Sequence, residues 1–240
     1  MTGASSGIGQ AIAVAFAEAG ADCLVHARRN RAGADESAAS IRCAGGESEV
    51  MLADLADDAA IEPFAEAAWN WRQGVDIWVN NAGADVLTGD AASWPFERKL
   101  EWLWRVDVVA TMQLSRSIGM RMKQRGGGVI LNVGWDRAEY GMAGDSGELF
   151  AATKGAVMAF SRSLAKSLAP EVRVNCLAPG WIRTAWGDEA SEYWQRRAES
   201  ESLLQRWGTP AEIAQAACFL ASPAASFITG QIVPINGGLA

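Results

Sequence analysis

The chain has 240 residues, half of them hydrophobic, and a formal net charge of −7 with acidic and basic side chains interspersed. This composition suits one globular domain over residues 1–240 and argues against a nucleic-acid surface, while the single histidine, His26, and four scattered cysteines argue against a metal site or a Ser-His-Asp triad. Without a signal peptide or an apolar run of membrane-spanning length, a cytoplasmic protein with no membrane partner is expected.

Short apolar runs alternate with amphipathic stretches along the chain. Near-continuous apolar runs are typical of parallel strands buried on both faces, and apolar residues at helical spacing predict the helices between them. This alternation predicts a three-layer, doubly wound α/β fold around a parallel sheet. The expected elements are helix 8–19, strand 22–27, strand 48–53, helix 57–72, strand 75–80, helix 96–123, strand 128–133, helix 150–168, strand 172–177, helix 188–205, helix 210–221 and strand 231–236.

The first helix is entered directly from the turn "MTGASSGIG" (residues 1–9). A doubly wound fold requires a strand before this helix, at the centre of the sheet. Without it, two strands would face each other across an unfilled slot with unpaired edges. The expectation is that the first strand is missing because the true start lies upstream of Met1.

The same turn places glycines at Gly3, Gly7 and Gly9. Glycines permit a tight turn and a close approach of the backbone to a pyrophosphate, and the following helix N-terminus offers free N–H groups and a positive dipole end. The pattern therefore predicts a dinucleotide site. Alone it is a weak signal, because glycine-rich turns are common.

The position expected to bind the adenosine ribose is Ala27, followed by Arg28 and Arg29. A carboxylate there would repel a 2′-phosphate, whereas a guanidinium can bind one through two hydrogen bonds. The residues therefore predict NADP as cofactor in preference to NAD. The alternative is that the two arginines are a solvated pair in a loop.

Several further motifs follow in order: "ADLAD" (53–57), "NNAG" (80–83), "RVNCLAPGWIRT" (173–184) and a Gly- and Pro-containing segment at 206–238. With "TGASSGIG" (2–9), they resemble the classical short-chain dehydrogenase/reductase family over nearly the whole chain, and 3-oxoacyl-acyl-carrier-protein reductases in particular. The resemblance implies a Rossmann fold, hydride transfer with a nicotinamide cofactor, and a homotetramer built on helices 96–123 and 150–168. The cofactor contacts it implies are Gly3, Ser5, Ser6, Gly7, Ile8, Gly9, Arg28, Asp54, Leu55, Asn81, Ala82, Gly83, Lys154, Pro179, Gly180, Ile182 and Thr184.

The family's catalytic residues are an asparagine, a serine, a tyrosine and a lysine, and only the lysine matches here. The corresponding positions are Asp107, Trp135, Phe150 and Lys154. A phenyl ring cannot supply a proton, and an indole cannot replace the serine hydroxyl beside a developing oxyanion. Lys154 is expected to keep its role at the nicotinamide ribose. Asp107 either forms an ion pair with Lys154 or is an ordinary carboxylate on a helix face.

Another proton donor is therefore needed if the protein is active. The loop 136–149 offers Asp136, Tyr140 and Glu148, of which a carboxyl group with a raised pKa or the phenol could act as the acid. Water beside Lys154 is a further candidate. For each loop residue, the alternative is an ordinary polar loop position.

Two functions stay open from the sequence. One is an NADP(H)-dependent oxidoreductase acting on a carbonyl or activated C=C group; the other is an inactive NADP(H)-binding sensor or scaffold subunit. Trp181 and Trp186 follow the Pro-Gly turn, where the resemblance implies a substrate lid, so a small apolar or aromatic substrate is expected. Trp102 and Trp104 are expected to serve packing or an oligomer surface.

Overall fold

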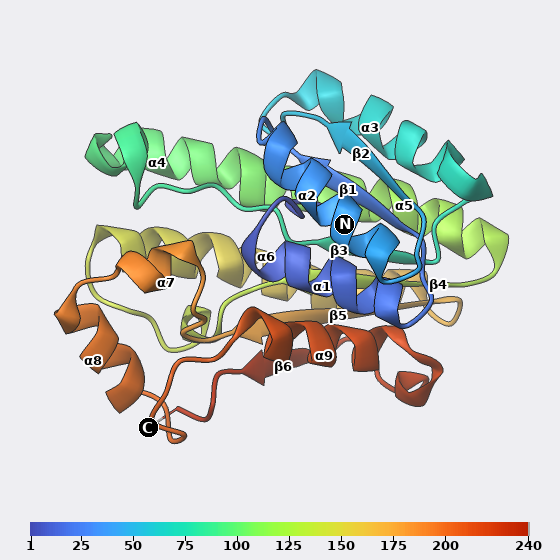
Figure 1. Cartoon of the computed structure of the whole chain (residues 1–240). Helices are drawn as coiled ribbons and strands as arrows, with labels where there is room; N and C mark the ends of the chain where they lie inside the picture. Colours follow the sequence, from blue (N-terminus) through green and yellow to red (C-terminus); the bar gives the residue numbers. More distant parts are fainter. Residues whose placement is uncertain (240) are drawn as a thin grey trace.

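Parallel strands form the centre of the fold, and helices cover both faces of the sheet (Figure 1). The computed structural model describes residues 1–239. Strand β1 pairs with β2, and β3, β4, β5 and β6 pair in that order, all in parallel. The strands are β1 Cys23–Ala27, β2 Ser48–Leu52, β3 Ile77–Asn80, β4 Gly128–Val133, β5 Val172–Pro179 and β6 Ile232–Ile235.

The helices form two layers with separate apolar cores. Helices α1, α2 and α9 pack together on one face, and α3, α5 and α6 on the other. No helix within residues 1–239 is both long enough and apolar enough to span a membrane. The α-helices are α1 Gly7–Glu18, α2 Arg31–Cys43, α3 Asp58–Asn70, α4 Phe96–Leu103, α5 Ala110–Arg125, α6 Asp145–Leu168, α7 Ala185–Glu189, α8 Glu192–Ser200 and α9 Pro210–Ala221.

The doubly wound prediction is confirmed, with four corrections to the helices. Helix α2 was not predicted, because three of its four buried residues are alanine or serine and give a weak apolar signal. Helix α6 begins at Asp145, so the second part of the predicted loop 136–149 is helical. The predicted helix 188–205 is two short helices, α7 and α8. A π-helical segment, Trp104–Val109, joins α4 to α5 within the predicted helix 96–123.

The first residues of the chain lie between β1 and β3. The Met1 ammonium group donates to the Leu24 carbonyl at 3.0 Å, the Met1 carbonyl accepts from the His26 N–H at 3.1 Å, and the Thr2 N–H donates to the Val79 carbonyl at 3.0 Å. These bonds match the end of a strand seated between two parallel neighbours. Beyond them a cavity of about 430 Å³ separates the first residues of β1 from those of β3. The slot expected from the sequence is therefore present.

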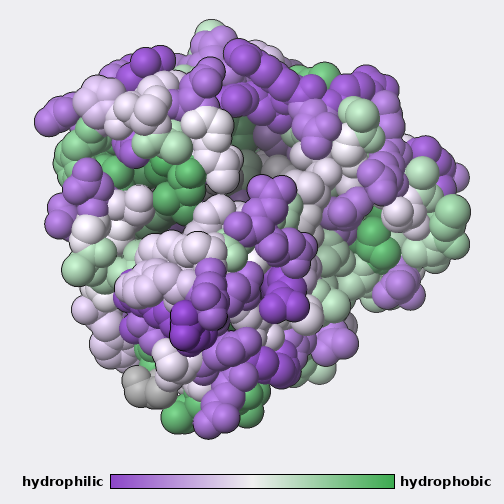
Figure 2. All heavy atoms as spheres, turned by 60° about the vertical axis from the view of Figure 1, so that its left-hand side comes forward, coloured by the Kyte–Doolittle hydropathy of each residue, from purple (hydrophilic) through white to green (hydrophobic). Residues whose placement is uncertain are grey.

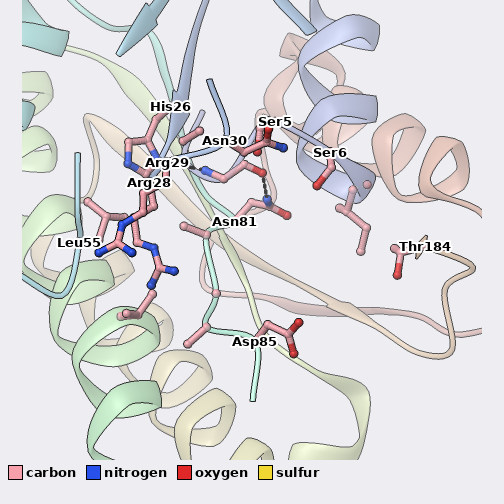
Figure 3. A pocket seen from close by; sticks show the side chains of 18 of the residues that line it. Ser5, Ser6, His26, Arg28, Arg29, Asn30, Leu55, Asn81, Asp85 and Thr184 are labelled. Carbon is pink, nitrogen blue, oxygen red and sulfur yellow. Dashed lines mark hydrogen bonds between the residues drawn. The ribbon is translucent and has the colours of Figure 1, made fainter. Parts of the chain in front are cut away.

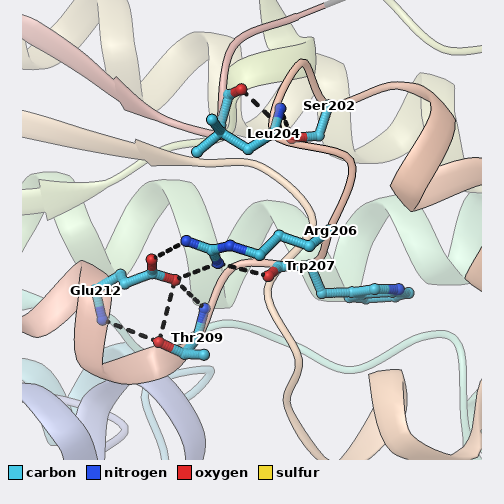
Figure 4. A network of polar contacts seen from close by, with 7 residues as sticks. Ser202, Leu204, Arg206, Trp207, Thr209 and Glu212 are labelled. Carbon is cyan, nitrogen blue, oxygen red and sulfur yellow. Dashed lines mark hydrogen bonds and ion pairs between the residues drawn. The ribbon is translucent and has the colours of Figure 1, made fainter.

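A hydrogen-bonded cap fixes the start of α9. The Thr209 hydroxyl accepts from the Glu212 N–H, the Glu212 carboxylate accepts from the Thr209 N–H, and Arg206 binds the same carboxylate (Figure 4). Hydrogen bonds from Arg206 and Thr209 lower the pKa of Glu212 to about 2. This capping box satisfies N–H groups that a helix start otherwise leaves free, and it anchors the chain that returns from α8.

Candidate functional site

A cavity of about 630 Å³ lies at the carboxyl ends of β1 and β3, with α4 and α7 at its margins. In the space-filling view, the molecule is hollowed on the face that carries these helices (Figure 2). This is the edge of a doubly wound sheet where ligands bind. The predicted cofactor contacts that line it are Gly3, Ser5, Ser6, Gly7, Ile8, Arg28, Asp54, Leu55, Asn81, Ala82, Gly83 and Thr184.

The glycine-rich turn fits a pyrophosphate. Gly3 has a φ of +61°, and a side chain there would come within 2.7 Å of the Ala82 Cα. The Asn81 amide donates to the Gly3 carbonyl at 2.8 Å, which ties the turn to the end of β3. The Ser6 side chain makes no capping hydrogen bond, so the first N–H groups of α1 can bind an anion.

Five predicted contacts do not line this cavity. Gly9 packs against the turn, where a side chain would collide with the Gly3 carbonyl, and Gly180 packs against Asn236. Ile182 is part of the apolar core. Lys154 is bound at a different position, described below, and Pro179 is the last residue of β5.

The only histidine of the chain is structural. Its Nδ1 accepts from the Gly3 N–H at 3.2 Å, and its Nε2 lies 3.0 Å from the Ala53 carbonyl. One acceptor and one donor nitrogen define a neutral ring. Burial lowers the pKa of His26 to about 4, so the ring stays neutral and links the turn to the segment after β2.

The residues that follow β1 line the cavity as expected, and α4 adds a residue that was not expected there. Arg28, Arg29 and Asn30 follow β1 directly and line one wall (Figure 3). Trp102 of α4 lines another wall of the cavity; it also packs against an apolar cluster, as expected, so its place at the cavity adds to its packing role. Its spacing of four from Val106, which also lines the cavity, places both on one helix face and was the available signal. Ala27 and Trp186, which the sequence had singled out, also line the cavity, and the remaining unassigned lining residues are His26, Ala84, Asp85 and Ala185.

Asp107 and Lys154 form a buried ion pair. The Asp107 Oδ2 lies 2.9 Å from the Lys154 Nζ, and the two side chains are 1% and 13% exposed. The other Asp107 oxygen accepts from the Ala84 N–H at 2.7 Å, and Lys154 also donates to the Val133 carbonyl at 3.3 Å. Asp107 belongs to the π-helical segment between α4 and α5. The ion pair is therefore present, and the alternative of an ordinary helix-face carboxylate is wrong.

Trp135 and Phe150 meet edge to face, with ring centroids 6.3 Å apart. Both are half-buried, and Phe150 packs against the apolar cluster of Val86, Leu103 and Leu149. Neither ring carries a group that can donate a proton to a substrate carbonyl. This aromatic pair occupies the positions where a general acid and an oxyanion donor would be needed. Neither group is present there, as the sequence predicts.

The three candidate acids do not gather around Lys154. Tyr140 is 70% exposed, and Glu148 is exposed on the first turn of α6. Asp136 is buried and accepts a hydrogen bond from Asn236 at 3.1 Å. Burial raises the pKa of the Asp136 carboxyl. No hydrogen bond or ion pair within residues 1–239 joins any of the three to Lys154.

The segment after β5 contains a cluster of four indoles. Trp181 stacks on Trp186 with ring centroids 6.2 Å apart, and both also contact Trp194 and Trp207. The Trp181 Nε1 donates to Glu201 at 2.8 Å, and the same carboxylate binds Arg137 and Arg197. Of the four, Trp186 lines the cavity.

Comparison with known proteins identifies the family of this chain. The profile of the family described as "Enoyl-(Acyl carrier protein) reductase" matches residues 3–240. The 3-oxoacyl-[acyl-carrier-protein] reductase of Aquifex aeolicus is 33% identical over 248 residues, which cover 100% of this chain and 95% of the relative. The chain belongs to the short-chain dehydrogenase/reductase family. Relatives are named as dehydrogenases and reductases, so this short-chain dehydrogenase/reductase is an oxidoreductase, and the reading as an inactive sensor or scaffold subunit has no support.

Two solved structures of this family show the same fold. A 7α-hydroxysteroid dehydrogenase complexed with NADH and 7-oxo glycochenodeoxycholic acid superposes with a TM-score of 0.90 at 31% identity, covering 100% of this chain and 92% of that one. L-Sorbose reductase from Gluconobacter frateurii, complexed with NADPH and L-sorbose, gives a TM-score of 0.88 at 30% identity, covering 100% and 94%. Both forms of nicotinamide cofactor thus occur among close structural neighbours.

Proposed function

We propose that this oxidoreductase uses NADP(H) to transfer a hydride to or from a carbonyl or activated C=C group of a small apolar or aromatic molecule. The observation that carries the proposal is the adenosine end of the cavity. There Arg28 and Arg29 follow β1, and the preceding position is Ala27, with no carboxylate to repel a 2′-phosphate. The NADPH and NADH of the two neighbours support a nicotinamide cofactor.

The chain's own residues have separate tasks in this proposal. The N-terminus of α1 binds the pyrophosphate, and Arg28 binds the 2′-phosphate. Lys154 holds the nicotinamide ribose, while the buried Asp107 carboxylate balances its charge. The bound cofactor supplies or accepts the hydride. The aromatic side chains of Trp135, Phe150 and Trp186 favour an apolar or aromatic substrate.

Water is the proposed proton donor. Phe150 has no proton to give, and Tyr140 and Glu148 point to solvent without contact to Lys154. Sustained NADPH oxidation in the presence of a panel of ketones and enones would support the proposed activity. Failure of every compound, with NADPH still bound tightly, would contradict it.

Arg28→Ala is expected to weaken NADPH binding by about 10–100-fold and to leave NADH binding nearly unchanged. The reason is the loss of charge-assisted hydrogen bonds to the 2′-phosphate, each worth about 1.5–3 kcal/mol. Fluorescence titration of both cofactors measures the effect, with Arg29→Ala as the control on the same wall. Equal affinities of the unmodified protein for NADPH and NADH would show that Arg28 is only a surface charge.

We further propose a homotetramer, supported by two separate exposed apolar sets. Trp104 and Met120 lie on the α4–α5 side and are 44% and 48% exposed, whereas Phe219 and Phe227 lie at and after α9 and are 49% and 102% exposed. Two self-complementary faces generate two two-fold axes, and hence four subunits. Light scattering should give the mass of four chains, and Trp104→Glu should give a smaller species. A stable monomer of the unmodified chain at micromolar concentration would refute the assignment.

A reducing, cytoplasmic location is part of the same proposal. All four cysteines are free thiols, and Cys23 and Cys176 are buried. Burial raises the pKa of Cys176 to about 12, so this thiol stays protonated and unreactive at neutral pH.

A further inference from the structure

Arg28 and Trp102 approach each other from different walls of the cofactor cavity. Arg28 follows β1, Trp102 lies on α4, and the guanidinium carbon is 5.1 Å from the centre of the indole ring. Figure 3 shows Arg28 and Arg29 together on the wall that follows β1. We propose that Trp102 is a positioning residue that orients Arg28 for the 2′-phosphate and thereby strengthens the preference for the phosphorylated cofactor. This inference rests on the proposed use of NADP(H).

The indole is itself held in place. Trp102 is half-buried and packs against the apolar cluster of Val86, Leu103 and Leu149. Trp94 meets it edge to face, with ring centroids 6.3 Å apart, and Arg98 in turn covers the Trp94 ring at 3.8 Å. A ring fixed on several sides presents a defined surface to the cavity. Trp102 can therefore act as a rigid platform for the exposed arginine.

Arg28 is suited to such a platform. The residue is exposed, and within residues 1–239 its side chain forms no ion pair and no hydrogen bond; its contact with Trp102 is the cation–π interaction. Stacking occupies a face of the guanidinium plane and leaves its N–H donors, which lie at the edge, free for a phosphate. Arg29 lines the same wall without an aromatic partner among the described residues. The structure thus distinguishes the two arginines.

Pre-orientation should favour the phosphorylated cofactor selectively. An arginine that is already restrained loses less side-chain freedom when it binds a phosphate. NADH has no 2′-phosphate and gains nothing from this restraint. A direct contact of Trp102 with adenine would instead affect both cofactors equally, because both carry adenine.

The test uses ligands that differ at the 2′ position and need no catalysis. Calorimetry measures the binding of 2′,5′-ADP and 5′-AMP to the unmodified chain and to Trp102→Leu, Trp102→Phe and Arg28→Ala. A matched control is Trp69→Leu, because the Arg125 guanidinium carbon lies at a similar 5.2 Å from the centre of the Trp69 ring and Trp69 does not line the cavity. Trp102→Leu should weaken 2′,5′-ADP about two- to fivefold and leave 5′-AMP unchanged. Trp102→Phe should lose less affinity for 2′,5′-ADP than Trp102→Leu, and Trp69→Leu should lose none.

Each other outcome overturns the inference in a recognisable way. Equal weakening of both ligands by Trp102→Leu would show a contact with adenine or a change of cavity shape. No effect of Trp102→Leu, with a large effect of Arg28→Ala, would leave the NADP preference intact and remove Trp102 from it. No effect of Arg28→Ala on 2′,5′-ADP would refute the NADP preference and the inference together.

Discussion

Replacing Lys154 with methionine is expected to lower the free energy of unfolding by about 3–5 kcal/mol, because it leaves a buried carboxylate without its counter-charge. Asp107 is 1% exposed, and its partner ammonium lies 2.9 Å away. Removing only one member of such a pair keeps the cost of burying the other charge. Urea denaturation followed by tryptophan fluorescence measures the loss.

The double variant Lys154→Met/Asp107→Asn is expected to regain most of this stability. Asparagine keeps a carbonyl oxygen that can accept from the Ala84 N–H, as the Asp107 Oδ1 does at 2.7 Å, but carries no charge. An exposed ion pair serves as the control: Arg31→Met breaks the contact with Asp35, whose members are 61% and 52% exposed, and should cost less than about 1 kcal/mol. Equal losses in Lys154→Met and Arg31→Met would refute the buried-charge argument.

The same double variant separates stability from cofactor binding. If Lys154 holds the nicotinamide ribose, the restored protein should still bind NADPH more weakly than the unmodified chain, and any turnover should fall with it. Recovery of both stability and NADPH affinity in the double variant would confine Lys154 to a structural role.

Local patterns predicted most of the fold. Strand β4 and helix α9 match their predicted ranges because each depends on neighbouring residues: a continuous apolar run for β4, and a capping threonine with a proline at the start of α9. Helix α2 was missed because Ala34 and Ala38 bury little apolar surface compared with Ile41. The early start of α6 was visible in principle, since acidic residues at a helix start, here Asp145 and Glu148, favour its dipole.

The site was harder to predict where side chains from distant segments meet. Asp136 is buried, and its carboxylate is bound by Asn236, one hundred positions away. Asp107 pairs with Lys154 from a π-helical segment, a local change of helical repeat that periodicity does not reveal. Trp102 meets Arg28 across the cavity, and no local signal links α4 to the end of β1. The glycine-rich turn was predictable, because its chemistry lies within seven consecutive residues.

The double variant Phe150→Tyr/Trp135→Ser is expected to raise the rate of ketone reduction with NADPH by about 10²-fold or more. The tyrosine would restore a general acid, worth roughly 10²–10⁴-fold, and the serine a donor to the developing oxyanion. Positions 150 and 154 lie one turn apart on α6, so the new phenol would stand near the Lys154 ammonium. Phe150→Tyr alone should raise the rate of ketone reduction only slightly, because Trp135 remains against the ring at position 150, with 6.3 Å between the ring centroids.

Steady-state rates on the same panel of ketones and enones also identify the native proton source. With water as donor, Tyr140→Phe, Glu148→Gln and Asp136→Asn should each leave the turnover of the unmodified chain within about twofold, because none of these side chains supplies the proton. A loss of tenfold or more in one of them, with NADPH affinity retained, would assign the acid to that residue. Unchanged ketone reduction in the double variant, despite normal folding and NADPH binding, would mean that the substrate carbonyl does not reach positions 135 and 150. Reduction confined to enones would then favour the activated C=C group as the native substrate.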